Sequence, residues 1–557
     1  MSHKWFESYQ DGVPHEIDFS AYNSIPDILE QSFEKFADRP SFHCMGKTFT
    51  FKEMDYLSQK FGSYLQNDLG LKKGSRVALM MPNILQYPIA LFAVLRTGMI
   101  AVNVNPLYTE RELEHQLNDS GAEVIIIFEN SAKILENVIG KTKIKHVVTT
   151  SIGDMLGFPK SLIVNFVIKH VKKMVPSWNL PGSIKFNDAL AMGNVDKYKR
   201  AELTLDDTAF LQYTGGTTGV SKGAELTHKN IVANMLQARE WIKGELTDGQ
   251  EIVITPLPLY HIFSLTANCF VFSSIGAMNV LITNPRDIPG FVKELSKWKF
   301  SAFTGVNTLF NVLVHNEDFK KLDFSGLKVS LGGGMAVQKA VAESWKEVTG
   351  KPLIEAYGLT ETSPAASINP LNIPAYNGKI GLPISSTILK IIDDEENDVA
   401  IGERGEIAIK GPQVMKGYWN KPEETAKVMT KDGFFKTGDI GTQDENGYFQ
   451  IVDRKKDMIL VSGFNVYPNE IEDVVVSHPK VLEAAAIGIP NEKSGEIVKI
   501  FIVKSDPSLT KEELIAYCKQ EMTGYKVPKL VEFREELPKS NVGKILRKDL
   551  RNEEPSK

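Results

Sequence analysis

One apolar stretch, residues 77–104, restricts the fold of this chain more than any other part of the sequence. It begins with the strand-like run VALMM, turns at Pro82-Asn83, continues through the helical pattern ILQYPIALFAVLRTG and ends in MIAVNV. Strands that are apolar throughout are typical of parallel sheets covered on both faces. Polar residues and prolines interrupt the stretch, so it lacks the roughly 20 apolar residues that a membrane-spanning helix needs. We therefore expect a buried β-α-β unit.

The same alternation of helix and strand recurs along most of the first 400 residues. Helical patterns at 110–119 and 289–298 precede apolar strands at 122–128 and 300–306, and a further strand-like run covers 276–283. After about residue 385, shorter strands bounded by Asp, Asn and Gly predict a β-rich subdomain. The last block, of about 100 residues, has its own helices and strands and is long enough to be a small domain. The predicted fold class is α/β, with a large N-terminal body of layered α/β subdomains, a β-rich subdomain and a small α+β C-terminal domain.

Composition limits the classes of function. The chain has 64 basic and 69 acidic residues and a net charge of −5, which argues against a nucleic-acid coat protein and against a polybasic membrane protein. Cys44, Cys269 and Cys518 are far apart and form no CxxC or Cys/His cluster, so a reducing cytosol fits best. The N-terminus lacks the unbroken apolar stretch of a signal peptide. We expect a cytoplasmic protein with no nucleic-acid partner.

The sharpest motif is YTGGTTGVSKG at residues 213–223, between the apolar run TAFLQY and a helix predicted to start near Thr227. Glycines let backbone N–H groups converge on an anion, hydroxyls donate to phosphate oxygens, and Lys222 adds positive charge. The motif is not a Walker A loop, because Lys222 follows Ser221 rather than Gly. The alternative is a flexible Gly/Thr turn, which rarely combines these residues so densely. The predicted phosphate-binding residues are Tyr213, Thr214, Gly215, Gly216, Thr217, Thr218, Gly219 and Lys222.

This motif resembles the phosphate-binding signature of the adenylate-forming superfamily, which includes acyl-CoA synthetases, peptide-synthetase adenylation domains and luciferases. Further matches follow in the family's order and span essentially the whole chain: PLYH at 258–261, GGG at 332–334, EAYGLTE at 355–361, TGD at 437–439, DR at 453–454, SGFN at 462–465 and PKSNVGK at 538–544. The longer stretch at 434–475 resembles bacterial long-chain fatty acyl-CoA synthetases in particular.

The resemblance implies a ligase that uses ATP and Mg²⁺ to make a fatty acyl-adenylate and then transfers the acyl group to coenzyme A. A carboxylate is a poor acyl electrophile, and adenylation supplies AMP as a leaving group. A medium-chain or aromatic acid–CoA ligase is the closest alternative, because it shares every motif. A non-catalytic acyl-nucleotide-binding or membrane-docking protein is disfavoured by the intact Lys544, Glu361 and Asp439. An enzyme that loads carrier proteins is disfavoured by the SGFNVYP segment.

The resemblance also implies roles for individual residues. The catalytic residues would be His261, Thr360, Glu361 and Lys544, with Glu361 as the magnesium ligand. The alternative for Glu361 is a surface residue that caps a helix, and a lone His is more often structural. The remaining residues implied to bind nucleotide or coenzyme A are Gly333, Gly334, Glu355, Ala356, Tyr357, Gly358, Asp439, Arg454, Gly463 and Phe464. Of these, Tyr357 would stack on adenine, Asp439 would accept from the ribose hydroxyls, and the segment at 462–465 would line a pantetheine tunnel.

Family members rotate a small mobile C-terminal domain between their two steps. The implied division is an N-terminal adenylate-forming domain at 1–453, a hinge at 454–457 that includes Lys456, and a mobile C-terminal domain at 458–557 that carries Lys544. On composition alone, the DRKKD run at 453–457 could equally be a solvated loop between strands. The acyl pocket is expected among the helix at 227–241, a strand after His261 and the region of Gly305. Neither chain-length preference nor oligomeric state follows from the sequence, and a homodimer stays open.

Residues 155–187 form a basic segment without any Asp or Glu. Asn165, Lys169, Lys172 and Lys173 recur with helical spacing opposite a set of apolar residues. A basic amphipathic helix is typical of a membrane surface, so an anionic membrane and a peripheral location on the inner face of the cell membrane are one interpretation. The other is a helix that packs on the core with a lysine-rich outer face.

Overall fold

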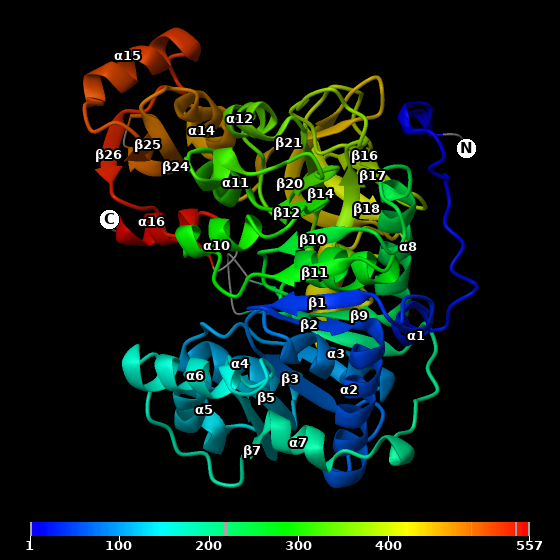
Figure 1. The fold of residues 1–557 in the computed structure, drawn as a ribbon. Coiled ribbons are helices and arrows are strands. Elements are labelled where there is room, and N and C mark those ends of the chain that lie inside the picture. Colours follow the sequence, from blue (N-terminus) through cyan, green and yellow to red (C-terminus); the bar gives the residue numbers. More distant parts are fainter. Residues whose placement is uncertain (1–2, 215–220, 492, 541–542, 555–557) are drawn as a thin grey trace.

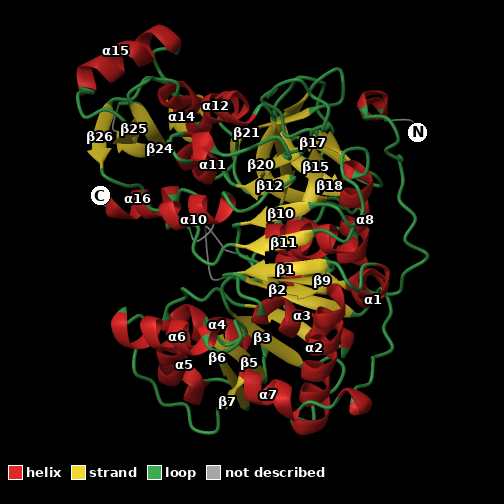
Figure 2. Cartoon of the chain, viewed as in Figure 1, coloured by secondary structure: helices red, strands yellow, loops and turns green. Residues whose placement is uncertain are grey.

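The computed structural model describes residues 3–214, 221–491, 493–540 and 543–554. Within these residues the strands form four sheets, and helices cover both large ones (Figure 1 and Figure 2). The predicted α/β fold class, with its β-rich subdomain and small C-terminal α+β part, is confirmed. The three cysteines are buried and unpaired. In the described part of the chain, no helix combines the length and apolar character needed to cross a membrane.

The first large sheet contains β1 (Pro40–Cys44), β2 (Lys47–Thr50), β10 (Ile252–Thr255), β11 (Met278–Leu281), β12 (Ala302–Gly305), β13 (Val329–Gly332), β14 (Leu353–Gly358), β15 (Ala365–Ile368) and β16 (Leu382–Pro383). Its order is β16-β15-β14-β13-β12-β10-β11-β1-β2. The strands from β14 to β1 are parallel, and the flanking β2, β15 and β16 are antiparallel. The carboxyl ends of its parallel strands therefore share one edge, where polar side chains can gather.

The second large sheet contains β3 (Arg76–Met80), β4 (Ile100–Asn103), β5 (Val124–Phe128), β6 (His146–Thr150), β7 (Ile184–Lys185), β8 (Thr208–Tyr213), β9 (Gly223–Thr227) and β19 (Gly417–Tyr418). Its order is β19-β9-β8-β4-β3-β5-β6-β7. The predicted β-α-β unit is β3, α3 (Gln86–Arg96) and the parallel strand β4. Every residue of α3 is buried, as expected for a helix that is apolar on all sides.

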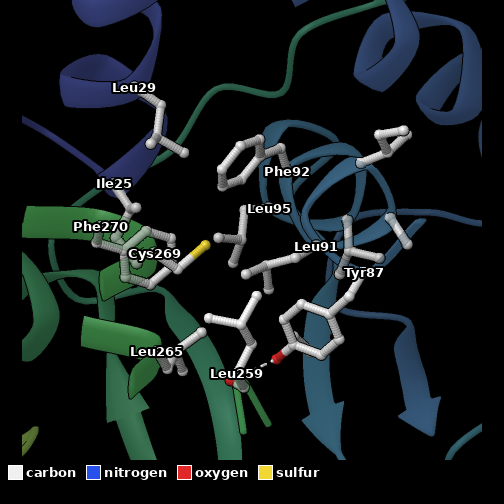
Figure 3. Packing of buried hydrophobic residues seen from close by; sticks show 14 of the residues in the cluster. Ile25, Leu29, Tyr87, Leu91, Phe92, Leu95, Leu259, Leu265, Cys269 and Phe270 are labelled. Atoms are coloured by element: carbon white, nitrogen blue, oxygen red, sulfur yellow. Dashed lines mark hydrogen bonds between the residues drawn. The ribbon is translucent and has the colours of Figure 1, made fainter. Parts of the chain in front are cut away.

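One hydrophobic core joins the two large sheets. It includes side chains of α1 (Ile25–Lys35), α2 (Phe51–Ser63), α3, α8 (His228–Ile242) and the π-helix η7 (Leu265–Phe272). Figure 3 shows Phe92 and Leu95 of α3 facing Cys269 and Phe270 of η7. The N-terminal part also contains the α-helices α4 (Glu110–Ser120), α5 (Ala132–Val138), α7 (Phe186–Met192), α10 (Ile288–Leu295), α11 (Asn307–Val314), α12 (Lys339–Thr349) and α13 (Pro422–Val428).

The β-rich subdomain is an antiparallel sheet of β17 (Ile388–Ile392), β18 (Gly405–Lys410), β20 (Phe435–Gln443) and β21 (Phe449–Arg454). In its register Asp439 of β20 lies opposite Arg454 of β21. Arg454, which we placed in the hinge, is therefore the last residue of a strand, and the chain turns at residues 455–457. The DRKKD run is mixed: Asp453 is fully buried in β21, whereas Lys455 and Lys456 are exposed in the turn.

The C-terminal part, residues 459–554, has its own sheet: β22 (Ile459–Val461), β23 (Phe464–Val466), β24 (Val481–Asn491), β25 (Gly495–Lys504) and β26 (Leu530–Arg534). Alternate residues of β25 supply two separate cores. Ile500 packs with α14 (Pro468–Val476) and α15 (Lys511–Glu521), whereas Phe501 packs with Leu550 of α16 (Arg547–Glu553). This part thus has a sheet covered on both faces, as a separate domain requires.

The basic segment contains a short helix, α6 (Lys160–Phe166), continued by the π-helix η5 (Val167–Val171). None of the residues of α6 or η5 is buried. The interpretation as a helix packed on the core through its apolar face is therefore wrong. The helix lies at the edge of the second large sheet, near α5 (Figure 1).

Candidate active site

A buried polar network fixes the loop that leads to His261. The hydroxyl of Tyr87 on α3 donates to the Leu259 carbonyl oxygen at 2.9 Å, a bond drawn in Figure 3. Asn83 Oδ1 accepts from the Leu259 amide at 2.8 Å, and Gln212 Nε2 of β8 donates to the Tyr260 carbonyl at 2.8 Å. Because these partners are buried, each broken bond would leave an unsatisfied polar group. The core that joins the two sheets therefore also positions the site.

His261 caps a helix rather than preceding a strand. Its Nδ1 accepts from the Phe263 amide at 3.4 Å at the start of α9 (Ile262–Ser264), which continues into η7. The strand expected after His261 is wrong; the apolar run LTANCFVF is helical and packs between the sheets. Burial, with a smaller contribution from the Lys544 charge, lowers the pKa of His261 to about 4. The imidazole is therefore neutral near pH 7.

The predicted phosphate loop connects two antiparallel strands, β8 and β9. The sequence reading missed β9, which lies between the loop and α8. Tyr213 ends β8, and the Thr214 amide donates to the Lys222 carbonyl at 3.0 Å, which closes the loop. The predicted residues Gly215, Gly216, Thr217, Thr218 and Gly219 lie outside the described residues.

Lys222 and Glu361 are linked through an aromatic residue that the sequence reading did not identify. The Tyr418 hydroxyl donates to Glu361 Oε1 at 2.8 Å, and the ammonium of Lys222 lies 4.9 Å from the centre of the Tyr418 ring. Lys222 also pairs with Glu424 on α13. Burial raises the pKa of Glu361. The only sequence signal for Tyr418 and Glu424 was the aromatic pair and acidic helix start in GYWNKPEE.

Asp439 is the centre of the predicted ribose-binding group. It is 3% exposed, accepts from the Tyr357 hydroxyl at 2.7 Å through Oδ2, and pairs with Arg454 Nε at 3.0 Å through Oδ1. The Asp439 charge is the first cause that raises the pKa of Arg454. Both oxygens of Asp439 are therefore engaged, and they hold the Tyr357 ring and the guanidinium in fixed positions.

The segment expected to hold adenine lies at the carboxyl ends of β13 and β14. A side chain at Gly333 would approach the Ala356 carbonyl oxygen to 3.1 Å, and one at Gly358 would collide with the Pro364 backbone. Gly334 has a φ of +78°, which also favours glycine. Glu355 accepts from the Val337 amide at 3.1 Å, and burial raises its pKa to about 8. Glu355 on β14 thus holds the segment between β13 and α12, which contains Val337.

Lys544 reaches the same site from the C-terminal part. Its loop is closed by the Ser540 amide, which donates to the Lys544 carbonyl at 2.7 Å. Thr308 Oγ1 of α11 donates to the Gly543 carbonyl at 2.9 Å, which ties this loop to the first large sheet. Burial, reinforced by the Arg454 charge, lowers the pKa of Lys544 to about 7.

Arg547, three residues further on, holds the C-terminal part against the hinge segment. Its guanidinium pairs with Asp453, Asp457 and Glu472 and donates to Asn469. Burial and the Arg454 charge lower the pKa of the neighbouring Lys456 to about 8. The acidic groups around Arg547 join β21, the turn at 455–457 and α14 in the present arrangement of the two parts.

Most of the predicted residues line one cleft of about 1610 Å³. From the described residues it includes Tyr213, Thr214, Lys222, His261, Gly333, Gly334, Glu355, Ala356, Tyr357, Gly358, Thr360, Glu361, Asp439, Arg454 and Lys544. Apolar side chains also line the cleft, among them Phe263, Ala267 and Val271 of the α9–η7 region, Ala238 of α8 and Leu331 of β13. The lining therefore combines polar and apolar groups.

Gly463 and Phe464 do not line this cleft. Gly463 has a φ of +84° and open space around it, and Phe464 is 54% exposed and stacks on Tyr525. Gly305 also lies outside the cleft lining, because Phe310 packs against it. The structure thus brings together the residues predicted for adenylation and leaves those predicted for coenzyme A elsewhere.

Comparison with known proteins adds independent observations. The family described as AMP-binding enzyme matches residues 29–419, and the AMP-binding enzyme C-terminal domain matches residues 470–544. The chain is 58% identical over 553 residues to a long-chain-fatty-acid–CoA ligase of Escherichia coli O6:H1, covering 99% of this chain and 98% of the relative. The corresponding ligase of Bacillus subtilis is 38% identical over 99% of this chain and 98% of the relative.

Solved structures agree in fold. The anthranilate CoA ligase AuaEII in complex with anthranoyl-AMP has a TM-score of 0.85 at 26% identity, covering 97% of this chain and 98% of that one. ATP-bound MatB from Rhodopseudomonas palustris has a TM-score of 0.82 at 25% identity, covering 95% and 99%. Both similarities extend over the N-terminal and C-terminal parts of this chain.

Proposed function

The chain belongs to the AMP-binding enzyme family, and from that premise we propose that it activates long-chain fatty acids to acyl-CoA with ATP. In the first step a carboxylate oxygen of the acid attacks the α-phosphorus of ATP, and pyrophosphate leaves. In the second the thiolate of coenzyme A attacks the acyl carbonyl, and AMP leaves. The observation that carries the proposal is a single cleft lined both by ionic groups and by apolar side chains from the η7 region and α8. Full-length similarity to long-chain-fatty-acid–CoA ligases supports the same chemistry.

Lys544 is the proposed catalytic cation of the first step. An ammonium that contacts both the fatty carboxylate and the α-phosphate in the cleft would stabilise the charge that develops in the transition state. In the free protein burial lowers its pKa to about 7. Two bound anions would favour the charged form again. The neutral His261, whose Nδ1 accepts from the Phe263 amide, has Nε2–H free to donate to a substrate oxygen.

The nucleotide would lie against the polar groups of the cleft lining. In this proposal Asp439 and Arg454 contact the ribose, Tyr357 stacks on adenine, and the backbone of Gly333, Gly334, Ala356 and Gly358 accommodates its edges. Thr214, Lys222, Thr360 and the loop at 215–219 contact the phosphates, so ATP must draw Lys222 away from Glu424.

Mg²⁺ is proposed to bind through Glu361 together with the ATP phosphates. Mg²⁺ in nucleotide sites uses one or two carboxylates plus phosphate oxygens and water. The donor set fits: Glu361 is a buried carboxylate on the cleft wall, and the described residues contain no cluster of three or more His, Cys, Asp or Glu that could hold a metal alone. When bound, the cation neutralises charge on the phosphates.

Coenzyme A requires a second arrangement of the two parts in this proposal. Rotation about the turn that contains Lys456 would withdraw Lys544 and bring the segment of Gly463 and Phe464 to the acyl-adenylate. Gly463 has the open surroundings and positive φ that close passage of a pantetheine chain requires.

The proposed setting is the cytoplasm, with peripheral binding to the anionic inner face of the cell membrane. Long-chain acids partition into bilayers, so a membrane-bound enzyme would meet its substrate there. A homodimer also remains part of the proposal, with solution mass as its test.

Pyrophosphate release across a series of fatty acids of increasing length, with and without coenzyme A, tests the proposal. Long-chain acids should give the highest kcat/KM, and acyl-CoA should form only with the thiol present. A preference for aromatic or medium-chain acids would support the alternative ligase instead; feruloyl-CoA synthase of Amycolatopsis, 31% identical over 508 residues, makes that comparison worth including. No turnover with any acid would contradict the enzyme assignment.

A further inference from the structure

The helical segment formed by α6 and η5 has an unusual orientation for an amphipathic helix. Large apolar side chains normally face the core, yet those of this segment face solvent: Leu162 is 63% exposed, and Ile163 and Phe166 59% each. Phe158, just before α6, is 85% exposed. Val171 and Met174, at and just beyond the end of η5, are exposed as well. Six of the thirteen exposed large hydrophobic side chains of the described residues therefore lie within residues 158–174. Apolar patches concentrated in this way mark interaction sites.

Polar contacts attach this helix to the body. Asn165 Oδ1 accepts from the Gly153 amide at 2.8 Å, and Asn165 Nδ2 donates to Asp154 Oδ1 at 2.9 Å. A side chain at Gly153 would approach Asn165 Oδ1 to 2.6 Å, so the helix is seated closely on this turn. Lys160 at the start of α6 donates to the Met45 carbonyl. The helix is therefore anchored through its polar residues and presents its apolar residues outward.

Positive charge lies next to the exposed apolar side chains of α6 and η5. Lys169, Lys172 and Lys173 are exposed, and residues 155–187, all of which the structure describes, contain no Asp or Glu. None of these three lysines forms an ion pair with a described residue within 4.0 Å. Their charge is therefore available to an external anion, next to side chains that favour an apolar phase.

We infer that α6 and η5 form the surface by which this protein docks on an anionic lipid bilayer, with Leu162, Ile163 and Phe166 inserted at the interface and Lys169, Lys172 and Lys173 among the head groups. The inference rests on the proposed function, because a long-chain acid is drawn from the bilayer. An interfacial helix combines such an apolar ridge with flanking lysines. A protein partner or a second copy of the chain would need acidic groups opposite the lysines, and either is an outcome of the test.

The test measures binding of the full chain to vesicles of phosphatidylcholine with and without phosphatidylglycerol. One variant carries Leu162→Ser, Ile163→Ser and Phe166→Ser; a second carries Lys169→Gln, Lys172→Gln and Lys173→Gln. Each lysine near an anionic surface contributes about fivefold to binding, so the lysine variant should bind about a hundredfold more weakly at low salt. The serine variant should lose about tenfold or more on vesicles of either composition. Binding by wild type should weaken as salt rises, since screening shortens the range of the charges.

Matched controls change lysine and apolar side chains at the surface outside α6 and η5. Lys320→Gln, Lys321→Gln and Lys339→Gln remove three other surface lysines, whose side chains are 41%, 72% and 74% exposed. Ile401→Ser removes another exposed apolar side chain, 60% exposed. Both controls should bind vesicles as wild type does. All variants should unfold at the wild-type temperature, because the altered side chains lie at the surface.

Equal, salt-insensitive binding of wild type and both α6–η5 variants would overturn the inference. If the α6–η5 variants differ from wild type in their mass in sedimentation but not in vesicle binding, the exposed apolar side chains contact a second copy of the chain instead. Wild-type acyl-CoA formation by both variants with dissolved fatty acid and no vesicles would leave the proposed function intact. If the wild-type protein itself forms no acyl-CoA, the proposed function is contradicted, and the vesicle result stands as a separate observation.

Discussion

Two loops of the C-terminal part, both predicted to act on substrate, differ completely in their surroundings. The Lys544 loop is hydrogen-bonded to Thr308 of α11, and its half-buried lysine lines the cleft with Asp439 and Arg454. The segment of Gly463 and Phe464 lies outside the cleft and is open to solvent. The present arrangement of the two parts therefore suits adenylation. Thioester formation is expected to need a second arrangement.

The two loops also differ in the contacts that support their proposed roles. The position of Lys544 rests on its place in the cleft lining and on the hydrogen bond from Thr308 to its loop. Gly463 has no such contacts, so its proposed role depends on the family resemblance and on a positive φ. A substitution in each loop should therefore slow the step proposed for that loop.

The largest effect is expected from Lys544→Ala. Loss of one charged transition-state contact should reduce acyl-adenylate formation by about 100-fold or more. Thioester formation from synthetic acyl-adenylate and coenzyme A should stay near the wild-type rate. Lys529→Ala, which changes an exposed lysine of the same part, is the control and should leave both steps unchanged. A collapse of both steps in Lys544→Ala would mean that Lys544 supports the fold or the turn.

Gly463→Leu should have the opposite selectivity. A bulky side chain there should slow thioester formation by about tenfold or more, while pyrophosphate exchange persists, because Gly463 is remote from the cleft in this arrangement. Gly402→Leu is a matched control, since Gly402 also has positive φ and open surroundings but lies in the N-terminal part. If pyrophosphate exchange falls as far as acyl-CoA formation in Gly463→Leu, the tunnel assignment fails.

Thr308→Val tests whether the bond to Gly543 positions the Lys544 loop. Loss of one hydrogen bond of about 1 kcal/mol should slow adenylation about fivefold. The thioester step from synthetic acyl-adenylate should not change. Thr308→Ser keeps the hydroxyl and should restore adenylation. Equal slowing of both steps, or no rescue by Ser, would show that Thr308 contributes only to packing.

Stability should also depend on pH through Lys544. Burial lowers the pKa of Lys544 to about 7 in the folded protein, against 10.5 as its ordinary value. The unfolded chain therefore binds more protons between about pH 7 and pH 10.5, and this residue's contribution makes stability rise with pH in that window. Lys544→Met should be more stable than wild type near pH 7, and its advantage should shrink as pH rises. Denaturant titrations of both proteins at pH 7 and pH 9 measure the difference; a constant difference would contradict a buried, perturbed Lys544.

Much of the fold was predictable because it depends on local patterns. The apolar run at 77–104 predicted β3, α3 and β4, and the helical pattern at 110–119 agrees with α4. The predictions failed where tertiary packing overrides a local pattern. The run after His261 has strand-like residues but forms η7, because it fills the space between two sheets. The short strand β9 was hidden by the glycine-rich loop before it.

Within the cleft, motif residues were predictable and their partners were not. Asp439, Tyr357 and Arg454 were named separately, but the hydrogen bond and ion pair that join them require β14, β20 and β21 to meet. Tyr418 was missed because its contact with Glu361 spans 57 residues of sequence. The assignments of individual site residues and the domain boundaries at 453 and 458 remain predictions.

By itself, the sequence determined the α/β class, the family and the residue types available for adenylation, because these depend on periodicity and on ordered motifs. Only the tertiary structure decided which face of an element turns inward. Helical spacing at 160–171 predicts an amphipathic helix for either orientation, since periodicity separates the faces without naming the inner one. The side chain of Asn165 forms hydrogen bonds with the turn at Gly153 and Asp154, which fixes the polar face of the helix against the body. The opposite face, with Leu162 and Phe166, is therefore exposed to solvent.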